Sequence, residues 1–292
     1  MHRQGVVGKR LTVHGEIGGL SIRRQGSSLG AYSPWEVPMY EIDSTTYRST
    51  AFNRRVRFLV FHYTALNFNG SINALVKGNA VSAHYLLPTP DDPTYQRAGF
   101  DQVRIFNLVD EQERAWHAGV STWAGRSNLN DTAIGIELVN EASVSDGQFT
   151  FPAYHPEQID ALIQLSQDIL RRYPDITPTH VIGHSDIAIG RKSDPGAAFP
   201  WQRLHQAGIG AWYEDARKAH FLDQFTRALP SDREVQAHLR TYGYDVPAQP
   251  NASQMRSLLR AFQLHFRPGD YRGVLDAETA AILYALVERY KT

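Results

Sequence analysis

The chain has 292 residues, about twice the ~150 expected for one domain, so we expect one large domain and one small one. Its composition, with 42% hydrophobic and 21% charged residues, is typical of a globular protein, and its formal net charge of +0 gives no long-range attraction to nucleic acid or anionic lipid. It contains no cysteine, which excludes disulfides, thiol nucleophiles and cysteine-ligated metals, so any metal site must use histidines and carboxylates.

The N-terminal region gives no sign of regular structure. Residues 1–50 are rich in glycine, arginine, serine and threonine, which predicts an irregular arm that wraps the main domain. Residues 1–15 contain neither the apolar core of a signal peptide nor a lipidated cysteine. The longest apolar stretch, residues 280–287, is much shorter than the ~18 residues that span a bilayer, so we expect the chain as given to be soluble.

Strand-like runs alternate with helical patterns over residues 51–228. Apolar runs of strand length, several rich in β-branched and aromatic residues, predict strands at residues 56–61, 82–87, 104–109, 133–139 and 179–183. A short amphipathic helix is expected from Ser71, as its N-cap, to a closing Gly78, and a longer one from Pro156 to Tyr173. This order is typical of an α/β (α+β) domain with a mixed central β-sheet flanked by helices.

The C-terminal residues 229–292 predict a separate small domain that begins near Pro230. Apolar residues at helical spacing indicate three helices, over residues 234–242, 254–266 and 276–290. A three-helix unit of this size is small but can fold.

Three residues that suit a metal site stand beside the predicted strands. His62 follows the apolar run FLVF, His184 follows HVIG, and Asp194 lies in the loop sequence RKSDPG. Two imidazoles and one carboxylate are typical of catalytic zinc, because three protein ligands leave the fourth tetrahedral position open for water. Each residue taken alone is more commonly a packing or hydrogen-bonding residue, and no HExxH pair is present, so the flanking sequences decide between the two interpretations.

Those flanking sequences resemble a known family. The segments VFHYT (60–64), GIEL (135–138), GHSD (183–186) and KSDPG (192–196) are similar to signature blocks of the amidase-2 family. Its members are N-acetylmuramoyl-L-alanine amidases, related to phage lysozyme-amidases and to peptidoglycan recognition proteins. The similarity runs in order from Arg57 to Trp201. The segments AWHAG (115–119), LNDT (129–132) and FPW (199–201) also resemble the AmiD-type cell-envelope amidases within that family.

The resemblance implies a role for each residue of the site. His62, His184 and Asp194 would bind Zn²⁺, Glu137 would act as the general base, and Lys192 would stabilise the oxyanion. The alternatives are a structural carboxylate at a strand end for Glu137 and an ordinary surface lysine for Lys192. Four further residues match family blocks near the groove and would bind substrate, unless the aromatic ones belong to the core: His84, Trp116, His117 and Asn130.

The implied activity is zinc-dependent hydrolysis of the lactyl–L-alanine amide between N-acetylmuramic acid and the stem peptide of peptidoglycan. The sequence leaves open whether intact wall or 1,6-anhydro muropeptides are preferred. Residues 273–279 resemble a turn of a peptidoglycan-binding three-helix domain, which would hold the enzyme on its polymer. The alternative is a segment that only stabilises the catalytic domain by packing.

Peptidoglycan or muropeptides are therefore the expected partners, and the cell envelope is the expected location. We expect a periplasmic protein, with outer-membrane anchoring through a signal outside this sequence as an option. The competing class is a non-catalytic peptidoglycan-recognition protein, which would typically lack part of the metal set. A glycosidase would need a second catalytic carboxylate opposite Glu137, and covalent acyl transfer would need a nucleophile that the sequence does not offer, since it has neither a GxSxG motif nor a cysteine.

Overall fold

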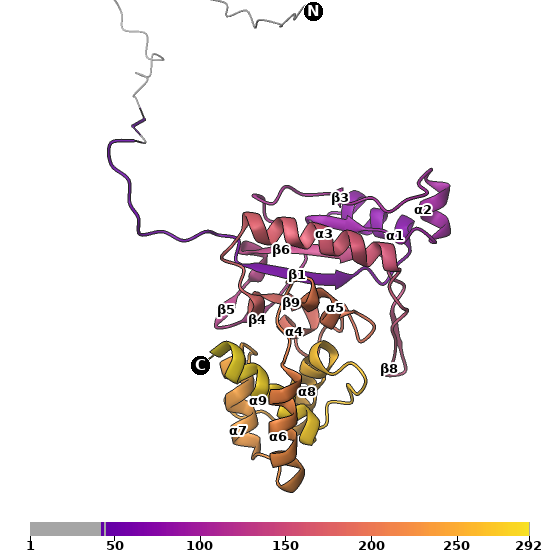
Figure 1. Ribbon diagram of the computed structural model, residues 1–292. Coiled ribbons are helices and arrows are strands. Elements are labelled where there is room, and N and C mark those ends of the chain that lie inside the picture. Colours follow the sequence, from indigo (N-terminus) through magenta and orange to yellow (C-terminus); the bar gives the residue numbers. More distant parts are fainter. Residues whose placement is uncertain (1–41, 44, 292) are drawn as a thin grey trace, which may run out of the picture. The chain divides into compact units, whose positions relative to one another are not determined.

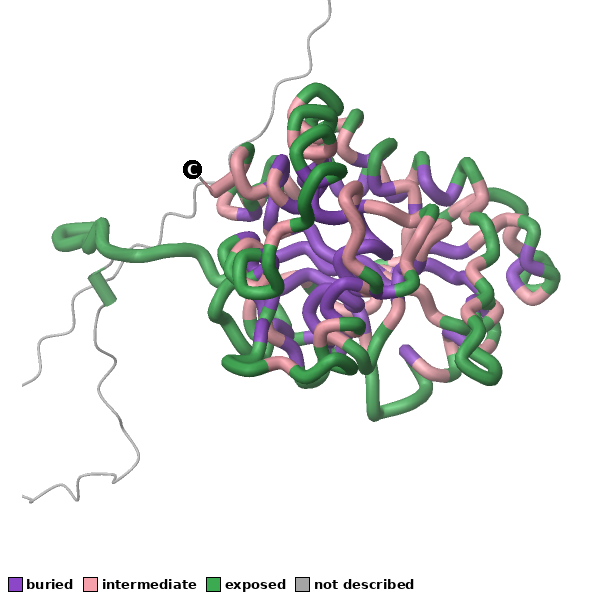
Figure 2. The backbone as a smooth tube through the Cα atoms, turned by 90° about the horizontal axis from the view of Figure 1, so that it is seen from below, coloured by how far each residue is buried: buried purple, intermediate pink, exposed green. Residues whose placement is uncertain are grey.

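The structure, a computed structural model, describes residues 42–43 and 45–291. Most of the predicted arm, residues 1–50, lies outside these described residues. Residues 42–43 and 45–51 form no helix or strand and are exposed, whereas the buried segments gather in the interior of the unit that begins at residue 52 (Figure 2). Among the described residues, no helix combines the length and the apolar character that crossing a membrane requires.

A five-stranded sheet forms the centre of this unit, with the strand order β3-β2-β6-β1-β9. The four parallel strands are β2 (Tyr85–Leu87), β6 (Ala133–Leu138), β1 (Phe58–Tyr63) and β9 (Val181–Gly183), and β3 (Phe106–Asn107) is antiparallel to β2. The predicted mixed sheet is confirmed, and each of the five predicted strands is present. The predicted strand 104–109 shortens to two residues because it pairs with β2 alone, at the edge of the sheet.

Helices flank this sheet, as predicted. The long helix α3 (Pro156–Arg172) lies across the sheet in Figure 1 and buries Ile159, Leu162 and Ile169. It begins as expected, with Pro156 in the first turn, and the structure shows His155 as its N-cap. The shorter elements are α2 (Pro93–Arg97), η2 (Leu129–Asp131), η3 (Pro178–His180), α4 (His184–Ile187) and α5 (Trp201–Gln206).

The predicted helix from Ser71 to Gly78 needs correction at both ends. Helix α1 (Phe68–Ile72) begins earlier, because the Asn67 side chain accepts a hydrogen bond from the Gly70 N–H and caps it, so Ser71 lies inside the helix. A π-helical turn, η1 (Asn73–Lys77), continues it. Gly78 then follows with an extended backbone, at φ −75°, and not in the left-handed conformation of a helix-ending glycine.

Two β-hairpins were not predicted from the sequence. One joins β4 (Thr122–Trp123) to β5 (Arg126–Ser127), and the other joins β7 (Ser143–Ser145) to β8 (Gln148–Thr150). Their strands have two or three residues each, which is too short for an alternating apolar pattern to be recognisable.

The three predicted C-terminal helices are present as α7 (Asp232–Tyr242), α8 (Ala252–Phe266) and α9 (Ala277–Lys291). A fourth helix, α6 (Asp215–Arg227), was not predicted. It packs along α9, with the Phe225 and Tyr284 ring centroids 4.7 Å apart and a salt bridge between Arg217 and Glu288.

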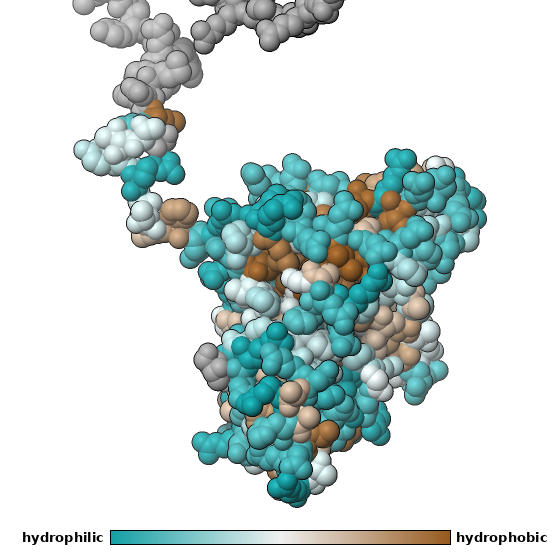
Figure 3. Space-filling model, viewed as in Figure 1, coloured by the Kyte–Doolittle hydropathy of each residue, from teal (hydrophilic) through white to brown (hydrophobic). Residues whose placement is uncertain are grey.

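The hydrophobic core is continuous across the predicted domain boundary near residue 229. One cluster of buried side chains includes Val60 and Ile182 of the sheet together with Leu239, Phe262 and Ile282 of α7, α8 and α9. On the face shown in Figure 3, these C-terminal helices present a mostly hydrophilic surface, as expected if their apolar sides point inward. The division into domains stays a prediction, and no gap in the core marks it.

Candidate active site

The carboxyl ends of three parallel strands bring the predicted site residues together. His62 of β1 pairs with Glu137 of β6 in the strand register, so both side chains lie on the same face at the same edge. His184 is the first residue of α4, directly after β9. Ligand sites of parallel sheets lie at this end of the strands, because the connecting loops gather there.

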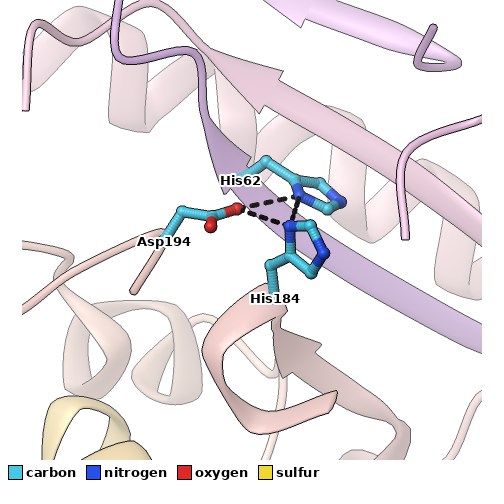
Figure 4. Close-up of side chains that lie close together, drawn as sticks. All are labelled: His62, His184 and Asp194. Atoms are coloured by element: carbon cyan, nitrogen blue, oxygen red, sulfur yellow. Dashed lines mark hydrogen bonds and ion pairs between the residues drawn. The ribbon is translucent and has the colours of Figure 1, made fainter. Parts of the chain in front are cut away.

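His62, His184 and Asp194 form a compact, buried group that could hold a metal ion. The Nδ1 atoms of the two histidines are 3.0 Å apart, and the Asp194 Oδ2 atom lies 2.9 Å from the first and 3.0 Å from the second. Figure 4 shows the three side chains pointing toward one another from β1, from α4 and from the loop after α4.

The other nitrogen of each ring is held by neighbouring residues of one loop. His184 Nε2 donates to the Ala118 carbonyl at 3.1 Å, and His62 Nε2 lies 3.0 Å from Nδ1 of His117. Burial, and next the charge of His184, lower the pKa of His62 to about 4, so its ring is neutral near pH 7. When each Nε2 donates its hydrogen, both Nδ1 atoms carry lone pairs.

The chemistry of this group fits a bound cation. Two nitrogen lone pairs and a carboxylate oxygen face one another at 2.9–3.0 Å, and such acceptors repel unless a proton or a cation lies between them. Two imidazoles with one carboxylate are donors that zinc accepts at catalytic sites. The three predicted ligands thus form one site.

The supporting loop is itself fixed from two sides. The Asn130 Oδ1 atom accepts hydrogen bonds from the backbone N–H groups of His117, at 3.1 Å, and Ala118, at 2.7 Å. From β6, Gly135 leaves the space that the His117 ring fills, since a Cβ atom at that position would lie 2.4 Å from the ring. Hydrogen bonds that orient metal ligands in this way typically matter for metal affinity.

Glu137 is half-buried, and its Oε2 atom is buried without a hydrogen-bond partner among the described residues. Burial, and next the negative charge of Asp194, raise its pKa to about 8, while the positive charge of Lys192 opposes the shift. A carboxylate with a raised pKa beside a metal site has the properties of a general base.

Lys192 is exposed, yet it lies close enough to the site to lower the pKa values of both His62 and Glu137 by its charge. Its neighbour Ser193 is held by the Tyr63 hydroxyl at 2.6 Å. The structure thus places Lys192 at the rim of the site.

The remaining predicted residues differ in their surroundings. Trp116 is 61% exposed and is free to contact a ligand. His84 is buried, and both of its ring nitrogens contact the backbone: Nδ1 accepts from the Gly135 N–H at 3.0 Å, and Nε2 lies 3.2 Å from the Glu113 carbonyl. His117 and Asn130 are both buried, and the side-chain contacts described above are made to the protein itself. Asn130 also belongs to the lining of a surface pocket, next to Arg114 and Asp131.

Sequence analysis did not anticipate that residues 117 and 118 support both histidines. The contact to His184 uses the backbone carbonyl of Ala118, which has no residue signature at all. Only the AWHAG segment marked the position, and it gave no indication of which partner the loop would meet.

Comparisons with known proteins identify the family of this chain. The Amidase_2 family, described as N-acetylmuramoyl-L-alanine amidase, matches residues 52–197. The N-acetylmuramoyl-L-alanine amidase AmiD of Escherichia coli is 45% identical over 253 residues, which are 86% of this chain and 89% of that protein.

Two solved structures match the fold closely. AmpDH3 from Pseudomonas aeruginosa, in complex with anhydromuramic pentapeptide, is 57% identical with a TM-score of 0.85, over 87% of this chain and 100% of that one. E. coli AmiD, in complex with the substrate anhydro-N-acetylmuramic acid-L-Ala-D-gamma-Glu-L-Lys, is 45% identical with a TM-score of 0.75, over 85% of this chain and 94% of that one. The chain is therefore an enzyme of the N-acetylmuramoyl-L-alanine amidase family, Amidase_2.

Proposed function

We propose that this enzyme hydrolyses, with zinc as its cofactor, the amide between the lactyl group of N-acetylmuramic acid and L-alanine of the stem peptide. The observation that carries the proposal is the group of His62, His184 and Asp194, whose ligand atoms lie 2.9–3.0 Å apart, with Glu137 beside His62 in the strand register. Zinc is the proposed ion because two imidazoles and a carboxylate leave one coordination position open.

The proposed substrates include muropeptides that end in 1,6-anhydro-N-acetylmuramic acid. Support comes from two relatives whose structures hold an anhydromuramic pentapeptide and an anhydro-N-acetylmuramic acid tripeptide. The first covers 87% of this chain at 57% identity, so its groove is a fair guide to the groove of this chain.

Zinc, when bound, would lower the pKa of water at the site and polarise the scissile carbonyl. Glu137 accepts the proton of the attacking water, whose oxygen joins the lactyl carbonyl carbon. The carbon–nitrogen bond then breaks, and Glu137 returns the proton to the departing amine of L-alanine. Lys192 places its positive charge beside the oxyanion that forms during the attack. The products are a lactyl carboxylate and a peptide with a free amine.

Two residues that were expected in the substrate groove are proposed to position the ligands. His117 would hold His62 with Nδ1 facing the ion, and Asn130 would fix the loop from which His117 projects. Trp116, which is exposed, is the proposed contact for sugar or peptide. A direct role for His84 in substrate binding is still a prediction, and both of its ring nitrogens already contact the backbone.

The cellular location of the enzyme is also a proposal, and so is the role of residues 229–292. An envelope or periplasmic enzyme, with an outer-membrane anchor as an option, follows from its proposed substrate. Binding of residues 229–292 to peptidoglycan would retain the enzyme on the polymer.

The test is zinc content together with peptide release from purified muropeptides, before chelation, after chelation and after zinc is restored. Metal-dependent release of a peptide with a free L-alanine amine is the expected result. Zinc-bound protein that releases nothing from several muropeptides would favour the non-catalytic recognition protein. New reducing ends in place of free amines would point to a glycosidase.

A further inference from the structure

Asp186 is a fully buried carboxylate two residues after the candidate ligand His184. Its Oδ2 atom accepts a hydrogen bond from the Gly183 N–H at 2.8 Å, which closes the turn of α4 around His184. The Ser185 N–H donates to the Asp194 carbonyl at 2.8 Å, so this turn also holds the loop of the third candidate ligand. The side chains that fix Asp186 therefore act on two of the three candidate ligands.

Two of those side chains come from the C-terminal helical segment, residues 232–291. The Tyr244 hydroxyl, just after α7, donates to Asp186 Oδ1 at 2.7 Å. Nδ1 of His265, in α8, lies 2.8 Å from Asp186 Oδ2. Burying a carboxylate is costly unless hydrogen bonds replace its water. Among the described residues three donors contact Asp186, and this pair supplies two of them.

Among the described residues, Asp186 is the polar side chain that the buried ring of His265 contacts. The ring is 2% exposed and stacks on Trp201, with centroids 3.6 Å apart. Its Nε2 atom is buried and has no hydrogen-bond partner among the described residues. A phenylalanine would satisfy the stacking, so the contact with Asp186 is what an imidazole adds at this position.

The same C-terminal segment also supports the chain just before β9. The Trp123 indole N–H donates to the Thr179 carbonyl at 2.9 Å, and the Trp123 ring lies 4.7 Å from that of Tyr244. The Ala124 N–H donates to the Gly243 carbonyl at 2.8 Å, which ties this indole to the C-terminal segment. Tyr244 thus contacts Asp186 directly, after His184, and residues 243–244 contact the Trp123–Ala124 pair that holds Thr179, before His184.

We propose that the C-terminal helices position the metal site, since Tyr244 and His265 hold Asp186, and Asp186 fixes the turn that carries His184. The inference rests on the proposed zinc site. It gives residues 232–291 a role in the catalytic unit that does not depend on binding a wall polymer. Tyr244 and His265 are positioning residues, because they touch neither the metal ligands nor the reacting atoms.

The test uses the full chain and removes only the two donors. Tyr244→Phe deletes one hydroxyl, and His265→Phe keeps a ring on Trp201. The matched control combines His238→Phe in α7 and Tyr290→Phe in α9, within the same C-terminal segment: His238 stacks on Tyr284 with centroids 3.7 Å apart, and Tyr290 donates to the Trp212 carbonyl at 3.2 Å. The zinc Kd is measured by chelator competition, and the Tm is measured with and without zinc.

We expect the Tyr244→Phe/His265→Phe variant to raise the zinc Kd about tenfold, the lower end of what partners of metal ligands contribute. The control variant keeps the wild-type Kd. The visible absorption of the Co²⁺-loaded Tyr244→Phe/His265→Phe variant should also differ from that of the Co²⁺-loaded wild type, because this absorption reports the ligand geometry.

A purely structural role would lower the Tm with and without zinc by the same amount and leave both the Kd and the Co²⁺ spectrum unchanged, which overturns the inference. If the double variant does not fold, Tyr244→Phe alone is measured in the same way, and a wild-type Kd there overturns it equally. A wild-type chain that binds no zinc contradicts the proposed function itself.

Discussion

Glu137 and His62 occupy paired positions on adjacent parallel strands, so the candidate base and a candidate ligand share one face of the sheet. Because Glu137 lies outside the group of three ligand atoms, its loss should spare the metal. We predict that Glu137→Gln retains zinc and lowers kcat by about 10²–10⁴-fold, the usual contribution of a general base. Metal analysis and muropeptide assays check this.

His62→Ala is the comparison for that experiment, because it removes a ligand atom and should abolish zinc binding. Near wild-type turnover in Glu137→Gln would exclude Glu137 as the base. Loss of zinc from the same variant would instead make Glu137 part of the metal site.

His117 is buried and its neighbour Trp116 is exposed, so substitutions at the two positions can separate ligand positioning from substrate binding. We predict that His117→Phe, which keeps a ring behind His62 but loses Nδ1, weakens zinc binding about 10–100-fold. Trp116→Phe should leave the zinc Kd unchanged and raise KM instead, since the indole is exposed and Trp116 is not one of the candidate ligands. Chelator competition and steady-state kinetics distinguish them, and an unchanged Kd in His117→Phe would refute the positioning role.

The pH profile should report Glu137, which must be ionised to act as a base. Burial raises its pKa from the ordinary 4.5 to about 8 in the metal-free protein, and a bound dication would bring it down again. Activity therefore rises with pH through the pKa of Glu137.

Lys192 lowers that pKa by its charge, so Lys192→Met should move the acid limb of kcat/KM to higher pH. The profile is measured on zinc-loaded enzyme, in which the position of the limb is independent of any loss in kcat. An acid limb at the same pH in Lys192→Met and wild type would show that a group other than Glu137 determines its position.

At this scale the sequence predicted the residues of the site better than their contacts. His62, His184, Asp194 and Glu137 could be named as candidates because strand ends and family segments mark them, and the structure brings the first three together. The supporting contacts of Ala118 and Asp186 were not predicted. The first joins the Ala118 backbone carbonyl to the ring of His184. The second joins the Asp186 carboxylate to the side chains of Tyr244 and His265, which are 58 and 79 residues away. No local pattern encodes such pairs.

Among the elements, α7 has a well-defined start that can be tested. Ser231 accepts a hydrogen bond from the Glu234 N–H, and the Glu234 carboxylate accepts one from the Ser231 N–H. We predict that Ser231→Ala lowers the free energy of unfolding by about 1 kcal/mol and Ser231→Gly by only a few tenths. Urea unfolding measures both, and equal losses would argue against a capping role.

Elements with a strong period were predicted well, and those without one were missed. Helices α3, α7 and α8 begin and end close to their predicted limits because each has an apolar face and a capping residue. Helix α9, in which the consecutive residues 279–283 are buried, also lies close to its predicted limits. Helix α6 has few apolar residues, gathered around Phe221 and Phe225, and becomes a helix by packing on α9. Helix α1 begins three residues before the predicted start at Ser71, because Asn67, and not Ser71, supplies its N-cap.

For the whole molecule, one continuous core implies one unfolding transition. Phe262 of α8 is fully buried in the same cluster as the strands of the sheet. We predict that Phe262→Ala costs about 3–5 kcal/mol and lowers a single Tm, seen equally by tryptophan fluorescence and by loss of peptide release. Two separate transitions, with only one of them shifted, would show that residues 229–292 fold independently.

Gly135, which lies against the ring of His117, limits which substitutions this enzyme can tolerate. A Cβ atom at position 135 would lie 2.4 Å from that ring, so even alanine would displace the imidazole that supports His62. A saturation-mutagenesis survey selected for turnover should therefore rank Gly135 with the proposed zinc ligands, although it carries no functional group. Natural or engineered variants that alter this position should need a smaller side chain at 117, and with it a different way of orienting the metal.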